Sequence, residues 1–301
     1  MPCSKSNLIK VQYTGAIASQ IIKNDRQGII LGMTSRGIFI KTDTRWLLFI
    51  SGEQIPGPLT INVPGLWETG IKLSSGDRVN IRSRNFSFPG SDFVITAQTQ
   101  SDYHHKPPSS PALSFSARQE KLEQVARHVI ASHETFPAHV LLHSWIPRLS
   151  KLPYEEVAIP KYYEQMTNLD RDPNGLYSLK SLVKLMGAGP GLTPSGDDFV
   201  IGYLLAVNRW GHLLSVTGKL KGFNQQVVST AYQRTTALSS NLIECASRGM
   251  ADQRLIDALD YLVSDTGQVL QVIDELLTWG NSSGLEVFLG FVAALSATNR
   301  T

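Results

Sequence analysis

The spacing of apolar residues changes near residue 100, and this change divides the chain into two parts. In the first part, short runs of Ile, Val, Thr and Phe alternate with Gly, Pro, Asn and Asp, a pattern that predicts strands joined by turns. The predicted strands are residues 28–33, 37–41, 46–51, 59–63, 78–82 and 93–99. Because no helical periodicity separates them, we expect residues 1–101 to form a small antiparallel barrel or sandwich.

A proline-rich segment follows these strands. Residues 102–114 contain Pro107, Pro108 and Pro111 among serines and histidines, and prolines at this density sustain neither helix nor sheet. We therefore expect a linker here, with a separate domain from residue 115 to residue 301.

The second part has the periodicity of helices. Apolar residues first recur at intervals of three and four at Leu122, Val125, Ala126, Val129 and Ile130. Similar spacing predicts further helices over residues 177–186, 195–214, 223–250, 253–263, 267–279 and 283–297. Strands and helices do not alternate, so the chain is predicted to be α+β, with a mainly helical second domain and no doubly wound sheet.

Composition and charge exclude several classes of partner. The 28 basic and 25 acidic residues are dispersed and give a net charge of +3, which does not indicate nucleic-acid binding. The apolar run 199–207 is short and interrupted by Gly202, so we expect no membrane segment, and the N-terminus does not resemble a signal peptide. Cys3 and Cys245 lie far apart without metal-ligand spacing, which favours reduced thiols in the cytoplasm.

Residues 187–202, GAGPGLTPSGDDFVIG, are the strongest candidate for a functional site. They match neither common phosphate-binding template, because no lysine follows the glycines and GxGxxG lacks its last glycine. Glycines nevertheless let the backbone approach a ligand, and a helix start offers free N–H groups and the positive end of the dipole. We therefore predict a small-anion site at the glycine turn (residues 187–195), with contributions from Gly187, Gly189, Gly191, Thr193, Ser195 and Gly196.

Two acidic residues follow the turn and are the candidate catalytic groups. Ser195 is predicted to be the N-cap, with Asp198 returning the capping-box hydrogen bond. Asp197 is then left to accept a proton, hold a donor group of the substrate or bind a metal. The alternative is that both carboxylates only stabilise the helix start, by roughly 0.3–1 kcal/mol. His139 and His143 are four residues apart, but the glutamate of an HExxH motif is absent between them. We therefore expect both histidines to be structural and not to bind a metal.

The sequence Ser283-Gly284-Leu285-Glu286 repeats Ser195-Gly196-Asp197-Asp198 after 88 residues, and at the same offset Gly290 repeats Gly202 and Ala294 repeats Ala206. Glycine inside a helix is unfavourable, so these positions predict two helices that cross closely with neighbouring N-termini. The pocket would then include Ser282, Ser283 and Gly284. The alternative is an internal repeat with two ordinary caps.

Hydroxyl and basic groups elsewhere are candidates to complete this pocket. Thr235 and Ser239 share one face of the predicted helix 223–250, although hydroxyls that bond back to helix carbonyls are the simpler interpretation. Positive charge for a phosphate or carboxylate is available at Lys184, Arg234 or Arg248.

The blocks GAGPGLTPSGDDFVIG, TTALSS and GNSSGLEVFLG resemble the AllH-type subunit family, which is linked to bacterial oxamate carbamoyltransferase of allantoin breakdown. The resemblance implies participation in the phosphorolysis of oxalurate to oxamate and carbamoyl phosphate, or a related carbamoyl transfer, together with other subunits. For such a reaction we expect Asp197 and Asp198 to be catalytic, the ligand to be phosphate, carbamoyl phosphate, oxamate or oxalurate, and no cofactor to be required. Two alternatives stay open: a non-catalytic scaffold subunit that binds an anionic metabolite, and a metal-assisted hydrolase that uses Asp197 and Asp198.

Overall fold

A computed structural model describes residues 7–98, 102–108, 111–132, 138–146, 149, 159–171, 177–213, 220–265 and 270–296. The chain divides into two compact units, Met1–His105 and Lys106–Thr301. The finer boundaries expected at residues 101 and 114 stay predictions. Cys3, and the expected element ends at Thr99, Leu214, Gly267 and Ala297, lie outside the described residues.

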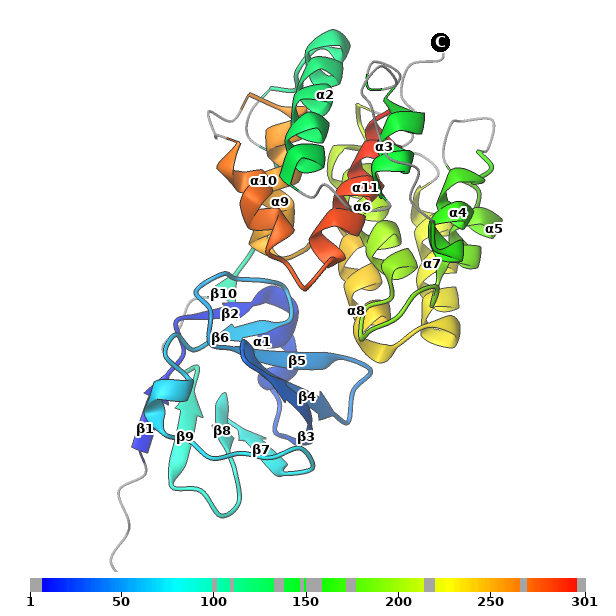
Figure 1. The fold of residues 1–301 in the computed structure, drawn as a ribbon. Helices are drawn as coiled ribbons and strands as arrows, with labels where there is room; N and C mark the ends of the chain where they lie inside the picture. Colours follow the sequence, from blue (N-terminus) through cyan, green and yellow to red (C-terminus); the bar gives the residue numbers. More distant parts are fainter. Residues whose placement is uncertain are drawn as a thin grey trace, which may run out of the picture. The chain divides into compact units, whose positions relative to one another are not determined.

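The first unit is built on one curled, mixed sheet (Figure 1). Its order is β1-β9-β8-β7-β3-β4-β5-β6-β2-β10. The strands are β1 (Asn7–Lys10), β2 (Tyr13–Gly15), β3 (Arg26–Thr34), β4 (Gly37–Thr42), β5 (Leu47–Ser51), β6 (Thr60–Asn62), β7 (Arg78–Arg82), β8 (Asn85–Ser87), β9 (Phe93–Thr96) and β10 (Asp102–Tyr103). Alternating side chains of the central strands form its core, among them Ile30, Ile38, Ile40, Leu48 and Ile50.

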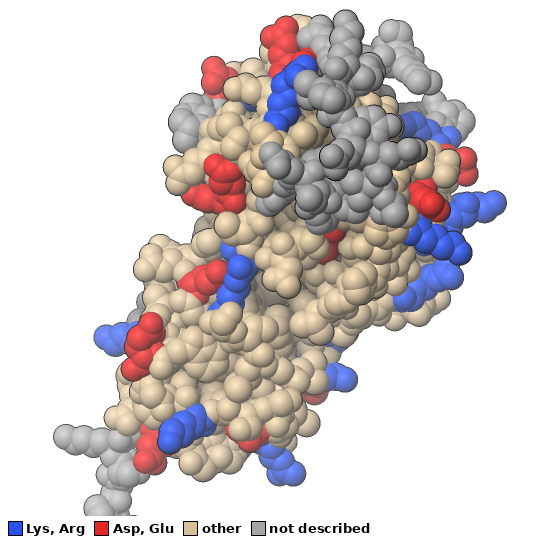
Figure 2. All heavy atoms as spheres, in the orientation of Figure 1, with Lys and Arg blue, Asp and Glu red and all other residues tan. Residues whose placement is uncertain are grey.

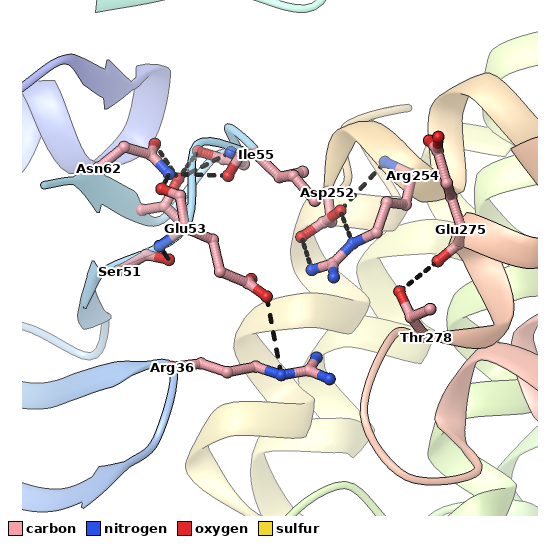
Figure 3. A network of polar contacts seen from close by, with 11 residues as sticks. Arg36, Ser51, Glu53, Ile55, Asn62, Asp252, Arg254, Glu275 and Thr278 are labelled. Carbon is pink, nitrogen blue, oxygen red and sulfur yellow. Dashed lines mark hydrogen bonds and ion pairs between the residues drawn. The ribbon is translucent and has the colours of Figure 1, made fainter. Parts of the chain in front are cut away.

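The expectation of a wholly antiparallel sheet is wrong. The pairs β1–β9, β2–β10 and β5–β6 are parallel, and a parallel pair requires a connection longer than a hairpin turn. Between β5 and β6 this connection is held by Asn62, whose Nδ2 donates to Glu53 O at 3.0 Å and Ile55 O at 2.8 Å (Figure 3). A short helix, α1 (Ala16–Ile22), was also not expected, and all its residues except Gln20 are buried.

The second unit is helical, which together with the sheet confirms the predicted α+β class. Its helices are α2 (Phe115–Ser132), α3 (Ala138–Trp145), α4 (Lys161–Thr167), α5 (Leu179–Leu185), α6 (Ser195–Trp210), α7 (Leu220–Arg234), α8 (Ala237–Ala246), α9 (Gln253–Val263), α10 (Gln271–Leu277) and α11 (Ser283–Leu295). Helices α6 and α11 lie side by side (Figure 1), and every residue of α11 is buried. These two helices form the centre of the unit.

The predicted helix 223–250 is broken, which corrects the expected placement of two site residues. The chain leaves α7 after Arg234 and starts α8 at Ala237, where Thr236 is the N-cap and accepts from Ser239 N at 3.1 Å. A threonine side chain that bonds nearby backbone competes with helix continuation. Thr235 and Ser239 therefore do not share a face of one helix.

No helix in the described parts of the chain is both long and apolar enough to cross a bilayer. Basic and acidic side chains are interspersed over the face of the molecule seen in Figure 2.

Candidate functional site

The close crossing of α6 and α11 is confirmed. A Cβ added to Gly202 would lie 2.1 Å from Val287 O, and one added to Gly290 would lie 2.3 Å from Phe199 O. Both obstacles are backbone carbonyls, so only glycine permits this approach. The two helix starts become neighbours, and the hydroxyl oxygens of Thr193 and Ser283 are 3.2 Å apart.

The two helix starts share their local packing as well as their sequence. A Cβ on Gly196 would lie 2.0 Å from Leu185 O, and a Cβ on Gly284 would lie 2.0 Å from Leu276 O. Each glycine thus allows the preceding helix to press its last turn against the start of the next. This equivalence supports the internal repeat that the sequence indicated.

The predicted capping box is wrong. Pro194 is the N-cap of α6, and its carbonyl accepts from the N–H groups of Asp197 at 2.8 Å and Asp198 at 3.1 Å. Proline is suited to this extended position before a helix, with φ −54° and ψ 144°. The Ser195 hydroxyl forms no cap and instead lowers the pKa of Glu286 on α11.

Most of the free backbone N–H groups lie in the glycine turn and not at the start of α6. Among the described residues, the N–H groups of Gly189, Gly191, Leu192 and Thr193 have no hydrogen-bond acceptor, whereas Gly196 N donates to a carbonyl within the turn. Gly189 and Gly191 adopt positive φ angles of 113° and 99°, which residues with a side chain rarely adopt. Successive free N–H groups in such a turn can form a concave anion site.

Asp197 fixes this turn from inside the protein. The carboxylate is 0% exposed; its Oδ1 accepts from Gly187 N at 2.8 Å and its Oδ2 accepts from Thr235 Oγ1. Burial raises the pKa of Asp197, while the hydroxyls of Thr235 and Ser239 and the Gly187 N–H lower it. Thr235 thus bonds to Asp197 despite the helix break, and Ser239 lies near enough to lower the Asp197 pKa although its Oγ has no hydrogen-bond partner among the described residues.

A second hydrogen bond ties the turn to the α7–α8 junction. Thr236 Oγ1 donates to Leu192 O at 2.7 Å, although the Leu192 side chain itself is 65% exposed. The turn is therefore held at both its start and its tip.

Asp198 is in the first turn of α6, near Ser283 and Glu286 of α11, and is 1% exposed. Burial raises its pKa well above the usual value, and the negative charges of Glu286 and Asp197 raise it further. The hydroxyls of Ser283 and Thr193 lower the same pKa. A carboxyl group in this setting retains its proton at higher pH than an exposed aspartate.

Glu286 occupies the equivalent position on α11. It is 1% exposed, burial raises its pKa, and its Oε1 accepts from the Tyr163 hydroxyl at 2.7 Å. Hydroxyls of Ser195 and Ser282 lower the Glu286 pKa. The pKa of each acid is thus lowered by a serine at the start of the opposite helix: Ser195 lowers that of Glu286, and Ser283 lowers that of Asp198.

Residues 185–295 match the family model described as oxamate carbamoyltransferase subunit AllH. The resemblance that the sequence indicated is confirmed over this AllH segment, which runs from the end of α5 to the end of α11 and is less than half of the chain. No solved structure matches the chain. The predicted catalytic and substrate-binding residues all lie within the AllH segment, whereas Lys184 and Tyr163 lie outside it.

The predicted cations differ in their availability. Arg248 of the AllH segment forms an ion pair with Glu244. Arg234 and Lys184 are exposed and form no ion pair with the residues that the structure describes. Arg234 is adjacent to the turn, because a Cβ on Gly187 would lie 2.8 Å from Arg234 O. Arg234 is thus the better placed of the two for an anion.

The two histidines considered as metal ligands, His139 and His143, belong to α3. His143 is buried in α3, and the side chain of His139 is outside the described residues. Within the described ranges, no three His, Cys, Asp or Glu residues group closely enough to hold a metal ion.

Proposed function

We propose that this chain is a subunit of an oxamate carbamoyltransferase and that its glycine turn binds a small anion. The ligand would be phosphate, carbamoyl phosphate, oxamate or oxalurate. The observation that carries the proposal is the set of unpaired N–H groups at Gly189, Gly191, Leu192 and Thr193, beside the starts of α6 and α11. Fixed donors of this kind stabilise phosphoryl or carboxylate charge without reorganisation.

The proposed reaction needs both anions to be held close together. A phosphate oxygen attacks the carbamoyl carbon of oxalurate, the bond to the oxamate nitrogen breaks, and that nitrogen takes a proton. Holding the reactants in line lowers the entropic part of the barrier. Hydroxyls of Thr193, Ser195, Ser282 and Ser283, with Gly187, Gly196 and Gly284 shaping the backbone, would complete the pocket.

The two aspartates have different proposed roles. Both oxygens of Asp197 already accept hydrogen bonds, so we assign it the positioning of the turn, together with Thr235 and Ser239. Asp198 is the candidate to transfer a proton, through the Ser283 or Thr193 hydroxyl, because burial favours its protonated form. Other subunits would supply the groups that the chain lacks.

A scaffold role is the second candidate, because the two acids are almost wholly enclosed. In that case the purified chain binds the anion but does not turn over any carbamoyl substrate. Turnover should stay absent after partner subunits are added, although the same subunits are active with other AllH-type chains.

A thermal-shift screen with phosphate, carbamoyl phosphate, oxamate and oxalurate tests the proposed site. Ligand at about 100 times its Kd adds roughly 2.7 kcal/mol to the free energy of unfolding. Gly191→Ala should abolish the shift, because φ of 99° strains any L side chain and displaces the N–H groups.

Gly90→Ala is the matched control for that variant. Gly90 also has positive φ, 88°, and open space around its Cβ position, but it lies in the sheet unit. It should lose similar stability and keep the full ligand shift. Absence of any shift in the parent protein, or an unchanged shift in Gly191→Ala, would contradict the proposed site.

Arg234→Ala should weaken anion binding about fivefold, since an exposed charge contributes about 1 kcal/mol at most. The loss should shrink at high salt as the charge is screened. Lys221→Ala is the control, because Lys221 is also exposed but lies at the other end of α7, about 20 Å away at the helical rise. Equal losses in both variants, measured by titration calorimetry at two salt concentrations, would argue against a role for Arg234.

A further inference from the structure

The buried acids Asp198 and Glu286 each keep one oxygen that receives no hydrogen bond. These atoms are Asp198 Oδ1 and Glu286 Oε2, which are fully enclosed and have no donor among the described residues. Both side chains are 1% exposed and stand at equivalent positions of two helices that cross at glycines. Buried polar atoms in native proteins almost always have a partner, so these two atoms require one.

Among the residues that the structure describes, no positive side chain acts on the pair to neutralise its two charges. The ionisable groups that act on the pair are Asp197 on α6 and Tyr163 on α4; the other influences are serine and threonine hydroxyls and the backbone. Among the described residues, no lysine, arginine or histidine shifts either pKa. Two neighbouring buried carboxylates without a cation cannot both ionise easily, and one protonated acid can donate to the free oxygen of the other.

We propose that Asp198 and Glu286 share one proton, with Tyr163 as the positioning residue, and that anion binding at the glycine turn is coupled to uptake of a second proton. The coupling rests on the proposed anion site, whereas the shared proton does not. The shared proton pairs the two open oxygens with each other and leaves one negative charge near the two positive helix ends.

The coupling follows from the direction of the hydroxyl hydrogen bonds. The hydroxyls of Thr193 and Ser283 are hydrogen-bonded to each other, so one of their two protons lies between them and only the other can be donated, either to Asp198 or to a bound anion. An arriving anion draws this proton outward and removes an interaction that favours the ionised pair. The pair then takes one proton from solvent, passing from one proton to two, and its remaining negative charge no longer opposes the anion.

The first test uses the protein without ligand. A folded-state pKa raised above the unfolded value means that the folded state holds more protons, so stability is complete below about pH 4 and falls as pH rises toward the raised pKa. Asp198→Asn can donate an amide N–H to Glu286 without titrating. It should flatten the fall of Tm with pH, and an unchanged slope would overturn the shared proton.

Tyr163→Phe separates the positioning role from simple packing. The Tyr163 hydroxyl lowers the Glu286 pKa, so its removal should move the pH window of the Tm decrease upward. A uniform loss of Tm at every pH would show that Tyr163 is only structural.

The second test is calorimetry with oxamate, whose carboxylate stays ionised over the range, in buffers of different ionisation enthalpy. We expect uptake of close to one proton per oxamate in the parent protein and none in Asp198→Asn. Binding without proton uptake in the parent would overturn the coupling and leave the anion site intact. If phosphate, carbamoyl phosphate, oxamate and oxalurate all fail to bind, the proposed function and the coupling both fail, while the flattened Tm profile still supports the shared proton.

Discussion

Gly290→Ala is expected to destabilise the helical unit strongly, because it places a methyl group inside the crossing of α6 and α11. The new Cβ would lie 2.3 Å from Phe199 O and 2.6 Å from Tyr203 N, and both are backbone atoms of a buried helix that cannot rotate away. Overpacking typically costs about 1–3 kcal/mol and occasionally more, and we expect the upper end here. Chemical denaturation of the full chain measures the loss.

Gly222→Ala is the matched control for this prediction. Gly222 lies in α7, and nothing stands within 4 Å of its Cβ position. The same substitution should therefore stabilise the protein by about 0.5–1 kcal/mol, because alanine favours the helix. Equal effects of Gly290→Ala and Gly222→Ala would contradict the close crossing of α6 and α11.

Asp197→Asn is expected to remove anion binding. Asparagine lacks the negative charge, and its single carbonyl oxygen can accept from Gly187 N while its NH2 group turns the Thr235 hydroxyl from a donor into an acceptor. Both hydrogen bonds that fix the turn therefore lose their ionised acceptor. We expect at least a tenfold loss of affinity, ~1.4 kcal/mol. Replacing two hydrogen bonds to a charged acceptor by weaker ones to a neutral amide should also lower the free energy of unfolding, by about 1–3 kcal/mol. Titration calorimetry and denaturation measure the two effects separately.

Thr235 supplies the controls for the Asp197 prediction. Thr235→Ser keeps the hydroxyl that donates to Asp197 and should bind anions as the parent protein does, whereas Thr235→Val should lose affinity in the same direction as Asp197→Asn. Parent-like binding by Asp197→Asn would show that the turn does not depend on this carboxylate.

The parts of the fold that follow from local physics were predictable. The crossing of α6 and α11 could be inferred because a glycine inside a helix is unfavourable unless a neighbour approaches closely, and the repeat placed one such glycine in each helix. The two-part α+β class could also be inferred, because the spacing of apolar residues follows from the local geometry of strands and helices.

The parts that depend on distant contacts were not predictable. Tyr163 and Glu286 are 123 residues apart, and no motif around α4 marks that tyrosine. The break at Thr236 and the cap at Pro194 depend on a choice between competing local hydrogen bonds, which composition does not decide. The parallel pairing of β5 with β6 depends on Asn62 holding a long connection.

The most direct test of the anion site is a backbone-amide NMR titration of the isotope-labelled parent protein with carbamoyl phosphate. We expect the amides of Gly189, Gly191, Leu192 and Thr193 to shift first and most, because their N–H groups are the free donors among the described residues. Gly90 and Gly222 should not move. Large shifts elsewhere with these four amides unchanged would contradict anion binding at the glycine turn.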